Sequence, residues 1–115
     1  MAKINTKIIY DKEEDILFLT KGKKVKASIE VGDFIIDIDK DGFVASIEIL
    51  NASENLNLEK EKLANIQKAS MVVTYKQNYI YIYLVLLIKK QEKSISIPLT
   101  INLGHTAKKE VIKFM

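Results

Sequence analysis

Four acidic residues and one glycine follow the spacing of a calcium-binding loop. They are Asp37, Asp39, Asp41, Gly42 and Glu48, which match the pattern D-x-D-x-D-G-x5-E. Carboxylates at alternate positions, a glycine that permits a sharp turn and a later glutamate can surround a hard cation with oxygen atoms. The spacing therefore makes cation binding one hypothesis for this segment.

The sequences on either side of this motif favour a β-hairpin instead. A calcium loop of this type needs a helix on each side, whereas GDFII and FVASIEIL read as strands. Asp41-Gly42 would form a two-residue turn with positive φ at both positions. Phe34, Ile36 and Ile38 would face Ala45, Ile47 and Ile49, while Asp37, Asp39, Ser46 and Glu48 would share the solvated face. We therefore expect no metal site, with a general acid–base pair of Asp37 and Glu48 as a further alternative.

A stripe of tyrosines is the second feature that could have a function. Tyr79, Tyr81 and Tyr83 alternate with aliphatic residues, which places them on one face of a strand. Stacking of single-stranded bases is one hypothesis, but contact with a second subunit or a partner is favoured, since tyrosine is enriched at protein interfaces. The wholly apolar run 84–88 predicts burial on both faces and a central or dimer-paired strand. The candidate interface residues are Tyr79, Tyr81, Tyr83, Leu84 and Leu86.

Other catalytic or cofactor-binding patterns are missing from the sequence. The chain has no cysteine, and His105 is its one histidine, so no cluster of these ligands can bind zinc. A lone histidine after Gly104 is typical of a turn or a helix start. The glycines lie apart, at 22, 32, 42 and 104, and there is no Gly-x-Ser-x-Gly motif. We predict a protein without catalytic residues or a cofactor, and not an enzyme.

The elements that would position these residues are mainly short strands. Strands are predicted at 4–10, 16–20, 28–31, 34–38, 43–50, 71–75, 79–88 and 94–99. The spacing of Leu56, Leu63 and Ile66 predicts one central helix over about 57–67, and the tail 106–115 is predicted as a further short helix. The pattern indicates a single α+β domain over 1–115, with a mostly antiparallel, curled sheet of about six to eight strands.

The stretch from about residue 8 to residue 53 resembles domain-of-unknown-function family 2283, a group of small bacterial and archaeal proteins. The residues that carry the resemblance are Tyr10, Asp11, Glu13 to Asp15, Leu17, Gly32, Asp37, Asp39, Asp41, Gly42 and Glu48 to Ser53. The resemblance implies a β-rich half over 1–53. Members that lie beside small toxin-like proteins would imply an antitoxin-like role in binding a partner. Residues 54–115 depart from the family pattern and are expected to add a helix and strands.

Composition narrows the classes of function further. The 115 residues include 18 Lys and no Arg against 15 acidic residues, a net charge of +3. Arginine is preferred for bidentate contacts to phosphate and guanine, so specific DNA recognition is disfavoured. The longest apolar run, 79–88, is about half of a membrane span, and residues 1–20 lack a signal peptide's apolar centre. We expect a cytoplasmic interaction protein, either a homodimer or the binder of another protein, with single-stranded nucleic-acid binding and cation binding as alternatives.

Overall fold

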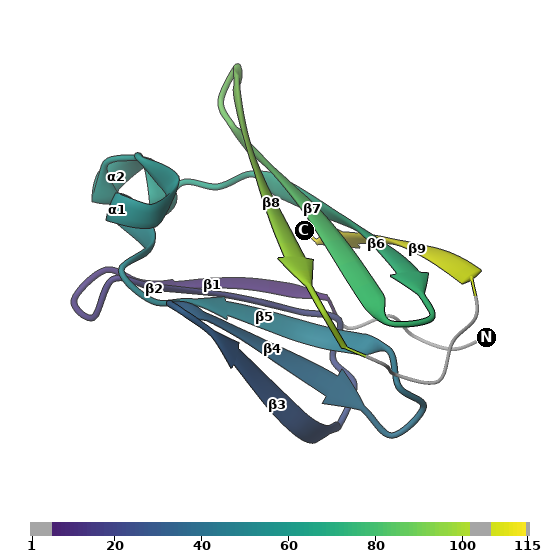
Figure 1. Ribbon diagram of the computed structural model, residues 1–115. Coiled ribbons are helices and arrows are strands. Elements are labelled where there is room, and N and C mark those ends of the chain that lie inside the picture. Colours follow the sequence, from purple (N-terminus) through teal and green to yellow (C-terminus); the bar gives the residue numbers. More distant parts are fainter. Residues whose placement is uncertain (1–5, 102–106, 115) are drawn as a thin grey trace.

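The computed structural model describes residues 6–101 and 107–114, which form two antiparallel sheets stacked face to face (Figure 1). The first five strands are β1 (Lys7–Asp11), β2 (Ile16–Thr20), β3 (Val25–Val31), β4 (Phe34–Asp39) and β5 (Val44–Ile49). The last four are β6 (Lys68–Lys76), β7 (Tyr79–Ile88), β8 (Gln91–Leu99) and β9 (Ala107–Phe114). The N-terminal sheet has the order β1-β2-β5-β4-β3, and the C-terminal sheet has the order β8-β7-β6-β9.

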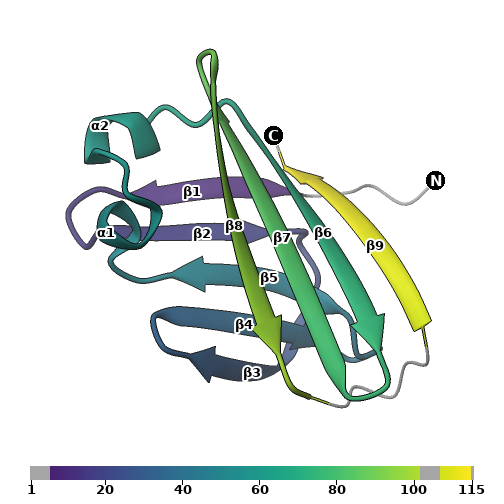
Figure 2. The ribbon, with the colours of Figure 1, turned by 45° about the horizontal axis from the view of Figure 1, so that its top comes forward.

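Alternating side chains build the hydrophobic core between the two sheets. On β7, the residues Ile80, Ile82, Leu84, Leu86 and Ile88 are buried, and the residues between them are more exposed. The N-terminal sheet contributes Leu17, Leu19, Ile36, Ile47 and Ile49, all with no exposed surface. Burying one such side chain contributes about 1.5–3 kcal/mol. The strands of the two sheets cross obliquely (Figure 2), so one core is shared by both halves of the sequence.

Two short helices, α1 (Ala52–Leu56) and α2 (Lys60–Leu63), replace the single helix predicted over 57–67. Asn57 ends α1 in the left-handed conformation, with φ 52° and its N–H bonded to the Glu54 carbonyl. The predicted helix is therefore wrong, because the apolar spacing came from two separate turns. The two helices lie at one end of the sheets (Figure 2) and bury Leu56 of α1 and Leu63 of α2 against the core. Leu58, between the helices, is buried there too.

The predicted C-terminal helix is also wrong for residues 107–114, which form β9. This strand pairs antiparallel with β6, from Ala107 opposite Lys76 to Phe114 opposite Ala69. The neighbours Val111 and Ile112 point to opposite faces, and β-branched residues suit such a half-buried strand. Pairing with the edge of β6 over residues 107–114 provides backbone hydrogen bonds that a helix would instead form within itself. His105 lies outside the described residues.

The antiparallel, strand-dominated character of the α+β prediction is confirmed, but one curled sheet is not what forms. The described residues contain nine strands in two sheets, more than the number predicted. The strands over 16–20 and 79–88 have the predicted bounds. No helix within residues 6–101 and 107–114 is long and apolar enough to cross a membrane.

Candidate functional site

The outer face of the C-terminal sheet carries exposed apolar and aromatic side chains, which we call the tyrosine face. Alternation along β7 turns its tyrosines away from the core. Tyr79, Tyr83 and Val111 expose 36%, 39% and 57% of their surfaces. The members of the tyrosine face are Tyr79, Tyr81, Tyr83, Val85 and Leu87 from β7, Val72 from β6 and Val111 from β9.

The strand register joins these side chains into one continuous surface. Tyr83 is paired with Val72, which is paired on its other side with Val111, so one apolar row crosses three strands. Side chains that are opposite each other on one face lie about 4.5–5.5 Å apart at Cβ. The Tyr81 hydroxyl donates a hydrogen bond to Ser96 Oγ at 2.7 Å, which orients its ring. Contiguous exposed apolar surface of this kind marks interaction sites on soluble proteins.

Positive charge surrounds the tyrosine face. A recess of about 420 Å³ lies beside Val85 and Leu87, with Lys68, Lys113 and Glu92 among the residues that line it. The register turns four lysines and one acidic residue of this sheet to the same outer face, namely Lys68, Lys76, Lys109, Lys113 and Glu92. The face therefore combines an apolar centre with a net positive surround.

The candidate interface residues divide between two faces of β7. Tyr79, Tyr81 and Tyr83 lie on the tyrosine face, whereas Leu84 and Leu86 lie in the core, with 0% and 1% of their surfaces exposed. The strand is central in its sheet, between β6 and β8. Sequence reasoning missed the contributions of β6 and β9, because alternation within one segment does not reveal which distant strand lies beside it.

The loop between β4 and β5 differs from the predicted two-residue turn. The Gly42 N–H donates to the Asp39 carbonyl at 3.1 Å, and the Asp39 N–H donates to the Phe43 carbonyl at 2.9 Å. Residues 40–42 therefore form a three-residue loop, with positive φ at Gly42 (83°) and not at Asp41. A bulge follows, so Ile38 pairs with Val44 rather than with the predicted Ala45.

Asp39 is a buried capping and ion-pairing residue, not a member of a solvated carboxylate row. Its Oδ1 accepts hydrogen bonds from the backbone N–H groups of Asp41 (2.9 Å) and Phe43 (3.0 Å). Its Oδ2 lies 3.6 Å from Lys21 Nζ. The bulge turns this side chain inward, and only 7% of the residue is exposed. The expectation that Asp39 lies on the wet face is therefore wrong.

Asp37 and Glu48 do lie on the outer face of the N-terminal sheet, but Asp37 already has hydrogen-bond partners. Its two oxygens accept hydrogen bonds from the hydroxyls of Ser28 and Ser46, each at 2.6 Å. Ser46 is fully buried, so this face is less solvated than predicted. Across residues 6–101 and 107–114, no three acidic, histidine or cysteine side chains are grouped so as to hold a metal ion.

A charged cluster links the two sheets beside this loop. Lys21 Nζ lies 2.9 Å from Glu110 Oε2, which belongs to β9. The Tyr75 hydroxyl donates to Glu110 Oε1 at 2.9 Å and accepts from the Val44 N–H at 2.8 Å. Burial, together with the negative charge of Glu110, raises the pKa of Tyr75 above its ordinary value of 10.0. This cluster links the two sheets, and the side chains of Lys21 and Asp39 are only 11% and 8% exposed.

Two residues of the family-like motif, Tyr10 and Ser53, donate hydrogen bonds to the carboxylate of a third, Asp15. Asp15, at φ 57°, accepts hydrogen bonds from the Tyr10 hydroxyl at 2.6 Å and from the Ser53 N–H at 3.0 Å. The Ser53 hydroxyl donates to its other oxygen at 2.5 Å. Burial favours the neutral acid, but these hydrogen bonds outweigh it and lower the pKa of Asp15 below 3.8. The cluster ties the β1–β2 turn to α1.

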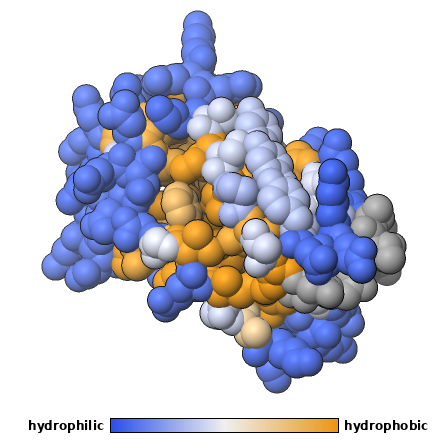
Figure 3. Space-filling view, viewed as in Figure 1, coloured by the Kyte–Doolittle hydropathy of each residue, from blue (hydrophilic) through white to orange (hydrophobic). Residues whose placement is uncertain are grey.

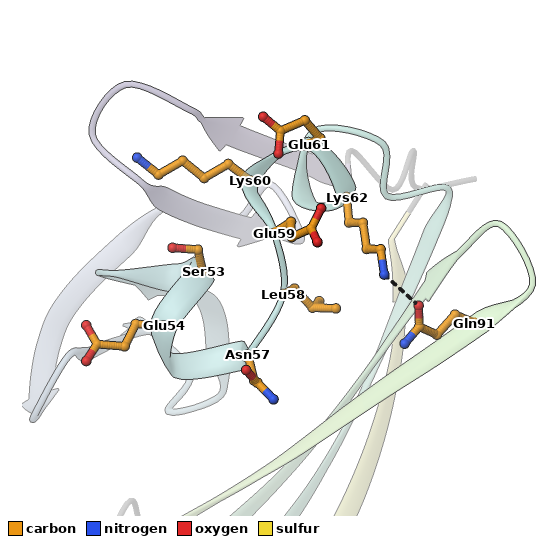
Figure 4. Close-up of a pocket in the computed structure, with 9 residues that line it drawn as sticks. All are labelled: Ser53, Glu54, Asn57, Leu58, Glu59, Lys60, Glu61, Lys62 and Gln91. Carbon is orange, nitrogen blue, oxygen red and sulfur yellow. Dashed lines mark hydrogen bonds between the residues drawn. The ribbon is translucent and has the colours of Figure 1, made fainter.

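A polar cleft of about 560 Å³ lies where the helices approach the tip of the β7–β8 hairpin (Figure 4). Lys62 Nζ donates a hydrogen bond of 3.4 Å to Gln91 across this cleft. Lys60 and Glu61 point away from its centre in Figure 4, and Glu61 is ion-paired with Lys12 at 3.3 Å. The polar side chains do not converge on a common point, so the tyrosine face is the stronger candidate.

Comparison with known proteins gives one family and two relatives. The family described as "Protein of unknown function (DUF2283)" matches residues 7–53, which span the N-terminal sheet and the start of α1. A Methanosarcina mazei protein named "Putative hypoxanthine phosphoribosyltransferase" is 36% identical over 89 residues, which cover 76% of this chain and 72% of that protein. An uncharacterised protein of Methanocaldococcus jannaschii is 36% identical over 94 residues, which cover 80% of this chain and 81% of that protein. No solved structure matches the chain.

Proposed function

The chain belongs to the family described as "Protein of unknown function (DUF2283)". On this premise we propose that it is a non-enzymatic interaction protein, whose tyrosine face binds an acidic surface of a partner protein. The observation that carries the proposal is the apolar row formed by Tyr83, Val72 and Val111, in which Tyr83 and Val111 are exposed and Val72 is half-buried. Aromatic residues supply much of the binding energy at protein interfaces, because they bury a large area at a small cost in conformational entropy.

The charges around this row indicate the chemistry of the partner. Four lysines and one glutamate share the outer face, so an acidic rim on the partner would complement it. Contact between the tyrosine faces of two copies would bring like charges together, so the charge disfavours self-association through this face. The recess beside Val85 and Leu87 fits an apolar side chain of the partner, with carboxylates placed near Lys68 and Lys113.

The same tyrosines and lysines support single-stranded nucleic acid as a second candidate ligand. Tyr79, Tyr81 and Tyr83 follow one another along β7, as residues that stack on successive bases do, and Lys76 is paired with Tyr79. The aliphatic residues Val72 and Val111 favour a protein ligand instead. A titration with a labelled oligonucleotide at low salt separates the two, because electrostatic affinity for nucleic acid is greatest there.

The name of the Methanosarcina mazei relative suggests an enzymatic alternative, phosphoribosyl transfer to hypoxanthine. The isolated positions of Gly22, Gly32 and Gly42 argue against it, since phosphate is commonly cradled by a glycine-rich loop. Incubation with hypoxanthine and a phosphoribosyl donor is expected to yield no nucleotide. Turnover that survives purification to homogeneity would replace the interaction proposal.

Selection from a random peptide library tests the proposed partner chemistry. We expect enrichment of peptides that combine aromatic or aliphatic residues with Asp or Glu, and weaker binding as salt increases. Val111→Glu should reduce their affinity at least about tenfold, because it buries a charge in the apolar row. The matched control is Ile9→Glu, which changes an exposed residue of the N-terminal sheet, 49% exposed. Enriched peptides that bind Val111→Glu as well as they bind the unmodified protein would contradict the proposal.

A further inference from the structure

The edge strand β3 is the most exposed strand of the N-terminal sheet. Among residues 6–101 and 107–114 it has one strand neighbour, β4, and its other side is an edge of the sheet. Six of its seven residues are exposed, including Val25 (43%) and Val31 (37%). A free edge presents unpaired backbone N–H and C=O groups, which makes it a template for another strand. β3 therefore provides backbone hydrogen-bonding groups and apolar side chains to an incoming strand.

The sequence of β3 is complementary to itself in the antiparallel direction. The strand reads VKASIEV. When two copies are paired about Ser28, Lys26 of one copy is opposite Glu30 of the other. The same register places Ala27 opposite Ile29, and Val25 opposite Val31. Opposite charges and paired apolar residues are the cross-strand pairs that stabilise sheets, and the arrangement has the two-fold symmetry of an isologous dimer.

Hydrophobic side chains are visible at the surface beside this edge. In Figure 3 they gather between β8 and the β3–β4 hairpin, where the edges of the two sheets face the viewer in the orientation of Figure 1. Half-buried residues of these strands are Ile29 of β3, Phe34 of β4 and Ile95 of β8. A second copy placed against β3 would cover part of this surface, which adds apolar burial to the backbone hydrogen bonds.

The edge strand β1 also allows self-pairing, but less extensively. If two β1 strands paired antiparallel about Ile9, Lys7 of one copy would be opposite Asp11 of the other. This strand has five residues against seven in β3, and one large exposed apolar residue against two. β3 therefore offers the longer and more apolar contact. β1 provides the natural comparison in an experiment.

We infer that two copies of this chain associate through antiparallel pairing of their β3 strands, centred on Ser28. Their five-stranded sheets would join into one continuous sheet across the two-fold axis. The pairing of β3 with β4 has a bulge at Lys26, between Val25 and Ala27. The regular pairs nearest the two-fold axis are therefore Ala27 opposite Ile29, and Lys26 and Val25 lie beyond them. The tyrosine face lies on the other sheet, so the dimer leaves it open, and this inference is independent of the proposed partner.

Single-cysteine variants test the register directly, because the chain contains no cysteine. Residues opposite each other in an antiparallel pair have Cα atoms about 4.5–5.5 Å apart, within the range that a disulfide spans. Under mild oxidation we expect Ser28→Cys to form a covalent dimer, seen on a non-reducing denaturing gel. Ile9→Cys, which tests the β1 edge, should remain monomeric on the same gel. Cross-linking of Ile9→Cys without cross-linking of Ser28→Cys would overturn the inference.

Charge exchange provides a second test that does not depend on Ser28. Lys26→Glu places Glu opposite Glu at two symmetric positions, and should raise the dimer dissociation constant about tenfold. The double variant K26E/E30K restores opposite charges and should return the constant to within about twofold of its original value. Lys23→Glu makes the same charge change outside β3 and should have little effect. The constants are measured by light scattering over a dilution series.

The possible results separate the two proposals. A monomer at all concentrations, or a double variant no better than Lys26→Glu, would overturn β3 pairing while leaving peptide binding at the tyrosine face intact. A dimer that is insensitive to Lys26→Glu but weakened by Val111→Glu would place self-association on the tyrosine face. This result would also overturn β3 pairing. Dimerisation with rescue by the double variant supports the inference whether or not a peptide binds.

Discussion

At the scale of single residues, Asp15 shows how one carboxylate joins segments that are distant in the sequence. It accepts hydrogen bonds from Tyr10 and Ser53, which belong to the first strand and the first helix. Its left-handed conformation is one that Asp and Asn adopt more readily than most residues. These three residues of the family-like motif therefore have a structural role, because they secure the β1–β2 turn and α1 to the N-terminal sheet.

Asp15→Asn is expected to lower the free energy of unfolding at pH 7 by about 1–3 kcal/mol, because it removes hydrogen bonds to a charged acceptor. The pKa of Asp15 is lowered from 3.8 in the folded protein, so its stabilising effect is present above pH 3.8 and is lost as pH falls through the lower folded value. Urea unfolding at pH 7 and at decreasing acidic pH measures both effects. The exposed Glu13→Gln serves as a control. If Asp15→Asn lowered the free energy of unfolding by the same amount at acidic pH as at pH 7, this account would be contradicted.

At the scale of elements, β7 separates two roles on alternate residues. Its inward side chains fill the core, and its outward tyrosines belong to the tyrosine face. This apolar strand occupies a central position in its sheet, between β6 and β8, where both of its backbone edges are paired. An edge position would leave its backbone groups free to pair with other chains.

Neighbouring substitutions on β7 should therefore have opposite effects. Leu84→Ala is expected to lower the free energy of unfolding by about 2–5 kcal/mol, since it opens a cavity in the core, but to leave peptide binding intact. Tyr83→Ala should change stability by less than about 1 kcal/mol and weaken peptide binding instead. Denaturant unfolding and peptide titration of both variants measure the contrast. Equal loss of stability in both variants would show that the outward side chain is also part of the core.

At the scale of the whole molecule, the two sheets are joined by buried apolar contacts and by the cluster of Lys21, Glu110, Tyr75 and Asp39. The residues that match the family form the N-terminal sheet, whose apolar inner face needs a cover. The C-terminal sheet provides that cover. The alignments with the two relatives span 89 and 94 residues, more than the family match over 7–53, so the sequence similarity includes part of the segment that forms this second layer.

A double-mutant cycle with Lys21→Met and Glu110→Gln tests the link between the sheets. We expect each single change to lower the free energy of unfolding by about 1–3 kcal/mol, with a coupling of at least about 0.5 kcal/mol. The control is the surface pair Lys12–Glu61, whose side chains are 56% and 69% exposed and should show almost no coupling. Similar coupling energies in both cycles would mean that the buried cluster adds nothing specific to the joining of the sheets.

Much of the local structure could be predicted from the sequence. The strands over 16–20 and 79–88, the tyrosine stripe and the hairpin around Gly42 follow from alternation and turn residues, which act over a few positions. The helix predicted over 57–67 failed because its leucine spacing does not distinguish one helix from two buried turns. The tail was predicted as a helix because nothing local showed that the edge of β6 was available to pair with it.

The sequence by itself determined which residues alternate and the absence of thiol chemistry and arginine. Only the tertiary structure decided that the strands divide into two sheets, that Asp39 turns inward to Lys21, and that Val111 lies beside Val72 on the tyrosine face. The physical reason is range. Side-chain alternation and turn chemistry are set by neighbours along the chain, whereas sheet order, bulges and surface composition depend on which distant strands pair.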